Sequence, residues 1–167
     1  NDRIVMMLGG QSTDSFTGSG IAAYSLSSGE LIKTYETEGQ GRFVVTSLLK
    51  KVDSGTETFS SDIDAPLATL VKLGDGELVL TGTNSSEGGV VVDAGILEVA
   101  GSDQLGTGTV VLSGGELELS ADGTVTNVIQ SEDDTSSIDV GENDVVASGE
   151  VNGSSKLTKI GSGELEL

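Results

Sequence analysis

Apolar and polar residues alternate along short blocks of this chain, and glycine, aspartate or asparagine closes most of the blocks. The alternation is clearest in residues 116–119 and 164–167, where glutamate and leucine take turns. Because successive side chains of a β-strand point to opposite faces, we expect these carboxylates to face water and the leucines to face a core. The chain has no sustained 3.6-residue periodicity, so the pattern predicts an all-β fold of many short strands.

The predicted strands recur at a fixed interval. The tripeptide Gly-Glu-Leu starts at residues 29, 76, 115 and 163, and a degenerate copy starts at Gly95. The copies at 76, 95 and 115 lie 19 and 20 residues apart. A period near 20 residues is typical of a solenoid, in which each turn buries its apolar residues against the turns on either side.

Aligning residues 91–99 with residues 111–119 predicts which side chains stack. Each copy reads as a strand, a glycine-containing corner and a second strand. Inward pairs are expected to form ladders with about 4.8 Å between turns, and these pairs are Leu78/Leu80, Leu97/Val99, Leu117/Leu119 and Leu165/Leu167. The same register places Glu98 beside Glu118 on the outer face. Two interpretations of that pair stay open, a solvated wall of like charges and a pair bridged by a cation.

Residues 1–66 follow the pattern less well. Alternation over residues 21–26 and 42–49 predicts strands, and the segment contains all three Phe and both Tyr. We expect a less regular β-rich segment or cap over residues 1–66, joined near Ala65-Pro66 to regular turns over residues 67–167. The pattern leaves open whether the first segment continues the coil or caps it.

Composition and charge exclude several classes of function. Cysteine and histidine are both absent, so the chain has no thiolate site and cannot by itself build a Ser-His-Asp triad. The formal net charge is −19, and 16 carboxylates but no lysine or arginine lie between Lys72 and Lys156. Such a surface repels phosphate groups, so we expect no binding to nucleic acid or to anionic membranes.

One dense group of carboxylates is a candidate calcium site. Its members are Glu132, Asp133, Asp134, Asp139, Glu142 and Asp144. Calcium takes six to eight oxygen ligands, but the spacing of an EF-hand is absent here. An exposed loop between turns is the favoured interpretation.

Other motifs resemble functional sites only superficially. The glycine-rich stretches Gly9-Gly10-Gln11-Ser12 and Gly18-Ser19-Gly20 lack a following helix and a Walker lysine, so we interpret them as turns. The pairs Glu36/Glu38 and Glu116/Glu118 share a strand face but lack the cleft that glycosidase chemistry needs. Asn152-Gly153 is interpreted as a tight turn. We predict no catalytic, cofactor-binding or metal-binding residues, no cofactor and no enzyme activity.

A longer repeat joins the strands into a larger frame. Residues 70–80 match residues 157–167 in the frame L-x-K-[LI]-G-x-G-E-L-x-L, 87 residues apart. Together with Gly82-Thr83-Asn84, Gly88-Gly89-Val90 and Leu105-Gly106-Thr107-Gly108, this frame resembles the passenger-associated transport repeat of autotransporters, the type V secreted proteins of Gram-negative bacteria. The resemblance covers residues 59–167 and departs from the family pattern at Ser86-Glu87, where an aromatic residue is usual.

The resemblance implies a right-handed parallel β-helix that is secreted or displayed at the bacterial surface, with an outer-membrane barrel C-terminal to these residues. The start at Asn1 without a signal-type stretch predicts a piece of a longer protein. Adhesion or self-association is the favoured function, with a second copy or a host surface or matrix molecule as partner. Residues 59–63 are also similar to the junction after a subtilisin-like protease in some autotransporters, which would make the chain a hydrolase stalk. A third alternative is that the turns assist passenger folding during export.

Overall fold

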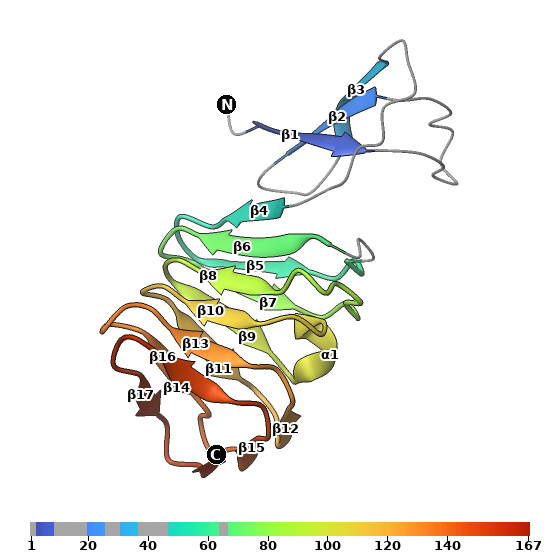
Figure 1. Ribbon diagram of the computed structural model, residues 1–167. Coiled ribbons are helices and arrows are strands. Elements are labelled where there is room, and N and C mark those ends of the chain that lie inside the picture. The colour runs from blue at the N-terminus through green and yellow to red at the C-terminus, as the bar shows by residue number, and fades with distance from the viewer. Residues whose placement is uncertain (1–2, 9–19, 26–30, 37–46, 64–66) are drawn as a thin grey trace.

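The computed structural model describes residues 3–8, 20–25, 31–36, 47–63 and 67–167. Three strands, β1 (Arg3–Leu8), β2 (Gly20–Ser25) and β3 (Leu31–Glu36), form an antiparallel sheet of their own. From β4 onward the described chain winds as a parallel β-solenoid of six turns (Figure 1). The predicted all-β solenoid is therefore confirmed.

Two six-stranded parallel sheets run the length of the coil, and we call them face 1 and face 2. Every turn contributes one strand to each sheet. Face 1 consists of β4 (Ser47–Lys51), β6 (Thr69–Leu73), β8 (Val90–Val92), β10 (Val110–Leu112), β13 (Ile129–Ser131) and β16 (Val151–Gly153). Face 2 consists of β5 (Thr56–Phe59), β7 (Glu77–Leu80), β9 (Ile96–Val99), β11 (Glu116–Leu119), β14 (Ser137–Asp139) and β17 (Thr158–Ile160).

A third, shorter sheet, face 3, closes the last three turns. It contains β12 (Gly123–Val125), β15 (Val145–Ala147) and β18 (Leu165–Glu166). In an earlier turn the corresponding stretch contains the four-residue helix α1 (Ser102–Leu105). Asn84 joins three turns there, because its Oδ1 accepts a hydrogen bond from the Ile63 amide and its Nδ2 donates one to the Gln104 carbonyl. A side-chain amide thus supplies the hydrogen bonds that strands supply later in the coil.

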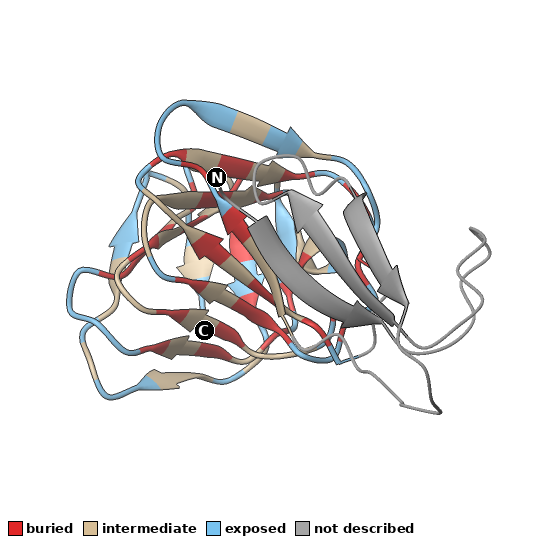
Figure 2. Cartoon of the chain, turned by 90° about the horizontal axis from the view of Figure 1, so that it is seen from above, coloured by how far each residue is buried: buried red, intermediate tan, exposed pale blue. Residues whose placement is uncertain are grey.

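The core is a set of aliphatic ladders inside the coil. Leu97 lies between Leu78 and Leu117 in the register of face 2, and Ile138 follows Leu117. All four side chains have 0% of their surface exposed. Figure 2 shows the alternation of buried and partly buried residues along these strands. The predicted inward pairs Leu78/Leu80, Leu97/Val99 and Leu117/Leu119 are confirmed, because each of these residues is at most 2% exposed.

The fourth predicted pair is placed differently. Leu165 pairs with Val145 on face 3, and not with the ladder of Leu117 on face 2. Leu165 is half-buried and Leu167 is 78% exposed. The two copies of the longer repeat therefore occupy different faces, since residues 70–80 contribute to faces 1 and 2 whereas residues 157–167 contribute to faces 2 and 3. The prediction was wrong because a third strand enters the later turns, so a motif of the same sequence arrives one face further around the coil.

The lysine of the first copy of the longer repeat, Lys72, lies inside the coil at the corner between faces 1 and 2. Lys72 shares the inward side of β6 with Leu70, and both are at most 2% exposed. Its Nζ donates hydrogen bonds to the carbonyls of Leu73, Gly74 and Ala94 at 3.1, 2.7 and 3.0 Å. Burial lowers the pKa of Lys72, and the nearby carboxylates of Asp75 and Asp53 oppose that shift. The ammonium group thereby satisfies corner carbonyls of two successive turns.

Several sequence predictions concern the remaining segments. The strand expected over residues 21–26 is present as β2, and residues 47–49 of the stretch 42–49 lie in β4. The division of the chain at residue 66 stays a prediction, and strands on its N-terminal side, β4 and β5, pair with β6 and β7. Asn152-Gly153 is not a tight turn, because both residues pair with Gln130 and Ser131 within face 1.

The described residues form no helix that is long and apolar enough to cross a membrane.

Candidate functional site

The outer side of face 2 carries a row of carboxylates, which we call the acidic row. Glu98, Glu118 and Asp139 occupy the same register position on β9, β11 and β14. Each carboxylate alternates with a buried leucine, isoleucine or valine on its own strand. Because successive side chains of a strand point to opposite faces, all three carboxylates point outward. Glu98 and Glu118 therefore lie side by side on the outer face, as predicted.

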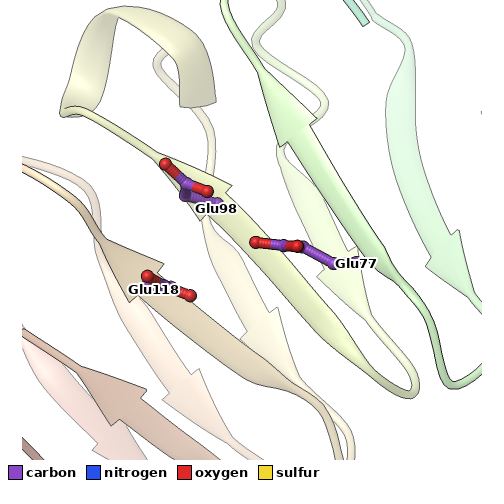
Figure 3. A group of neighbouring side chains, drawn as sticks. All are labelled: Glu77, Glu98 and Glu118. Atoms are coloured by element: carbon purple, nitrogen blue, oxygen red, sulfur yellow. The ribbon is translucent and has the colours of Figure 1, made fainter. Parts of the chain in front are cut away.

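Glu77 joins this row from the preceding turn. It pairs in register with Ile96, so it lies diagonally across from Glu98. Carboxylate oxygens of Glu77, Glu98 and Glu118 all lie within 4.8 Å of one another (Figure 3). Sequence reasoning missed Glu77 because it compared only positions at the same register. Diagonal neighbours are still within reach of a side chain as long as glutamate, so a comparison at a shift of two residues would have found it.

Glu118 is surrounded by other carboxylates of face 2. Burial raises the pKa of the Glu118 carboxyl, and the charges of Glu98, Glu77, Asp139 and Glu116 raise it further, in that order. Hydroxyl donors partly stabilise two other carboxylates on the outer side of face 2. Thr56 donates a hydrogen bond to Glu77 at 2.5 Å, and Ser137 donates one to Glu116 at 2.8 Å.

The geometry limits what this group can do chemically. Three converging carboxylate oxygens could contribute to a divalent-cation site, but calcium needs six to eight oxygen ligands, so water would have to supply the others. A general acid and a general base must sit in environments that separate their pKa values, and these carboxylates share one half-exposed sheet surface. The site is best described as a concentrated negative surface.

The acidic cluster predicted from the sequence is dispersed along the coil. Glu132, Asp133 and Asp134 are exposed at the corner after β13, and Asp139 belongs to the acidic row. Among the described residues, the one group of three or more converging acidic side chains is Glu77, Glu98 and Glu118.

Several carboxylates of the dispersed cluster have local structural roles. Asp133 accepts hydrogen bonds from the hydroxyl and amide of Thr135, which lowers its pKa. Asp134 accepts a hydrogen bond from the backbone amide of Lys156 on the next turn. These carboxylates order the corners of the coil.

Other sequence candidates are only partly covered by the structure. The stretch Gly9-Gly10-Gln11-Ser12 and residues 18–19 lie outside the described residues, as does Glu38 of the pair Glu36/Glu38. Glu116 and Glu118 both lie on the outer side of β11, as predicted, on an open sheet face. The expectation that the chain holds no catalytic, cofactor-binding or metal-binding residue stays a prediction.

The raised pKa of Glu118 predicts a pH dependence of stability. A carboxyl whose pKa is higher in the folded state than its ordinary value of 4.5 binds its proton more readily when folded. The free energy of unfolding should therefore rise as pH falls from neutral toward 4.5 in low salt. Glu118→Gln should stabilise the coil at pH 7 by about 0.5 kcal/mol and weaken the pH dependence.

Urea unfolding at pH 5 and pH 7 measures this effect, with Glu87→Gln as the control. Glu87 is an exposed carboxylate outside the acidic row. Equal pH dependence in the Glu118→Gln and Glu87→Gln variants would show that repulsion within the row is negligible.

Comparison with known proteins supports one family. Residues 70–99 match the family described as passenger-associated-transport-repeat. Over 119 residues, or 68% of the chain, the sequence is 39% identical to the protein named adhesin BmaC autotransporter from Brucella suis biovar 1 (strain 1330). The chain spans only 3% of that relative's length. No solved structure gives a significant match. The matched repeat, the similarity to an autotransporter and the six-turn coil together show that the chain belongs to the autotransporter passengers, which are secreted and displayed at the bacterial cell surface.

Proposed function

We propose that this coil is an adhesive segment of its passenger, and that it holds cells together by self-association or attaches them to host surface or matrix molecules. The observation that carries the proposal is the arrangement of the coil, in which parallel sheets present uninterrupted rows of side chains along six turns. The similarity to a protein named as an adhesin supports the same function. Repeated rows suit multivalent contact, because many weak contacts combine into strong attachment when two surfaces are held close.

A non-catalytic role is part of this proposal. The chain lacks histidine and cysteine, and the carboxylates that converge do so on an open sheet surface. Binding to an extended partner needs a long accessible face more than it needs a cleft. The faces of the coil provide such a surface.

The proposal is tested by displaying the full-length passenger on a non-aggregating bacterial strain. We expect cells that display the passenger to aggregate or to bind immobilised matrix, and cells that display a passenger without residues 67–167 to lose at least half of that activity. Surface labelling must first show that both passengers are displayed equally. Equal aggregation and equal matrix binding by the two strains would refute an adhesive role for this segment.

A further inference from the structure

The ladders inside the coil end in charged residues at the first turn. β4 and β5 form this turn, at one end of the coil (Figure 1). On face 2, Glu57 occupies the register position that Leu78 and Leu97 occupy in the next two turns. On face 1, Lys50 is in register with Lys72. The first turn therefore places a cation and an anion at ladder positions that are mostly aliphatic in later turns.

These two charged side chains meet inside the coil. The Nζ atom of Lys50 lies 2.5 Å from Oε1 of Glu57, so the ion pair joins face 1 to face 2 across the interior. The ammonium group also lies 4.8 Å from the centroid of the Phe59 ring, which is a favourable cation–π distance. Phe59 in turn packs against the aliphatic core. The three side chains form one layer across the end of the core, which we call the closing layer.

The closing layer is suited to a position with water on one side. Lys50 is 1% exposed, whereas 26% of the Glu57 side chain is exposed. Glu57 therefore stays partly hydrated while it neutralises the lysine. A further turn stacked on β4 and β5 would strip this water from the carboxylate and bury the ion pair completely. The desolvation penalty of a buried ion pair can exceed its Coulomb attraction, so such stacking is disfavoured.

The strand edges of the first turn would otherwise be open to pairing. β4 and β5 stand at the ends of their sheets, and no strand in the described part of the chain pairs with their outer edges. An open sheet edge can pair with a strand of another molecule. Charged side chains that point inward from an edge strand oppose such pairing, because the added strand would bury them.

A buried lysine alone does not end the coil. Lys72 has a turn stacked on either side of it. Its ammonium group is hydrogen bonded to corner carbonyls, one of which belongs to Ala94 on the following turn. Lys50 is instead paired with a carboxylate of its own turn. The feature that distinguishes the first turn is therefore the glutamate at the ladder position of face 2.

We propose that the closing layer terminates the coil at β4 and β5, and that its ion pair keeps this end from stacking on the coil of a second copy. The role is independent of the proposed adhesive function, because it concerns the end of the coil and not its faces. It implies that copies of the chain do not join end to end through the first turn.

Replacement of the ion pair by aliphatic residues tests this role in the whole chain. Lys50→Leu/Glu57→Leu extends the ladder of Leu78 into the first turn and leaves the net charge unchanged. The variant should fold, because hydrophobic replacement of a buried ion pair is often neutral or stabilising. In sedimentation velocity, we expect it to associate at a protein concentration at least tenfold lower than the native chain does.

Lys51→Leu/Asp53→Leu is the matched control. Lys51 and Asp53 form an exposed ion pair on the outside of the same turn, with 2.8 Å between Nζ and Oδ1. The control also exchanges an ion pair for two leucines, so it tests whether added apolar surface is enough to cause association. We expect the control to sediment like the native chain. Equal association of the two double variants would overturn the proposal, as would a folded Lys50→Leu/Glu57→Leu chain that sediments like the native chain.

A second variant separates the effect of charge from that of apolar area, and also serves if the leucine variant does not fold. Lys50→Met/Glu57→Gln removes both charges and nearly preserves the lengths of the side chains. Circular dichroism establishes that each variant is folded. We expect the neutral variant to associate more than the native chain and less than the leucine variant. A folded neutral variant that stayed as monomeric as the native chain would show that the charges of the closing layer do not protect this end.

Discussion

Replacing Leu117 with aspartate is expected to abolish the cooperative unfolding of the coil. Leu117 has 0% of its surface exposed and stacks between Leu97 on one turn and Ile138 on the next. The substitution removes a buried aliphatic side chain and introduces a charge between two buried apolar neighbours, Leu97 and Ile138. We expect a loss of more than about 4 kcal/mol, since large-to-small core substitutions alone cost about 2–5 kcal/mol. Thermal melting followed by circular dichroism measures the effect.

Val111→Asp is the matched control for this substitution. Val111 lies on a strand of the same turn, but it points outward and is partly exposed. We expect this variant to lose about 1 kcal/mol or less and to melt cooperatively. If Leu117→Asp melted like the native chain, the inward ladder of face 2 could not be the core of the protein.

Gly95→Ala is expected to destabilise the coil by about 3 kcal/mol or more. Gly95 forms the corner between faces 1 and 2 and has a φ of +65°, which costs about 1–2 kcal/mol for a residue with a Cβ atom. That Cβ would also lie 2.4 Å from the Gly76 carbonyl oxygen and 2.5 Å from the Gly74 carbonyl oxygen on the turn below. Both contacts are with backbone atoms, so relief requires the two turns to move apart. Urea unfolding measures the loss.

Two further glycine-to-alanine substitutions separate the causes. Gly55 has a φ of +71° but open space where a Cβ would lie, so Gly55→Ala should cost only about 1–2 kcal/mol from backbone strain. Gly101 has extended backbone and the same open space, so Gly101→Ala should be nearly neutral. An effect at Gly95 no larger than that at Gly55 would mean that close stacking of the corners contributes little.

The inward ladders could be predicted because two independent regularities agree. The period of two assigns Leu117 and Leu119 to one side of their strand, and the 20-residue offset stacks them on Leu97 and Val99. Neither regularity depends on loop conformation. The number of faces could not be predicted in the same way. The strands of face 3 are only two or three residues long, so their sequences are too short to be told from loops by alternation.

The interior position of Lys72 could have been predicted from the same alternation. Lys72 follows Leu70 by two residues, so a strand that turns Leu70 inward also turns Lys72 inward. Lysine is usually found at the surface, so a buried lysine is predicted only when polar partners for its ammonium group can be identified. Those partners are backbone carbonyls at the corner, and their convergence depends on how two turns stack.

The acidic row was predicted in part for a related reason. Glu98 and Glu118 are equivalent in the 20-residue repeat, whereas Glu77 reaches them along a diagonal. Alignment of the repeat is therefore enough to predict that Glu98 and Glu118 are neighbours. The diagonal arises because Glu77 stands one residue after its glycine, whereas Glu98 and Glu118 stand three residues after theirs, so alignment of the glycines pairs Val79 with Glu98.

The parallel stacking of the turns also determines how the coil would respond to mechanical load. The strands lie across the long axis, and the backbone hydrogen bonds between successive turns point along that axis. Tension applied to the ends would load these bonds in a row, so that the terminal turn peels away before the next one is stressed. Force applied sideways to a face would be shared among many bonds at once. A tether built in this way would resist shearing flow along its flanks and lengthen in small steps when it is pulled from its tip.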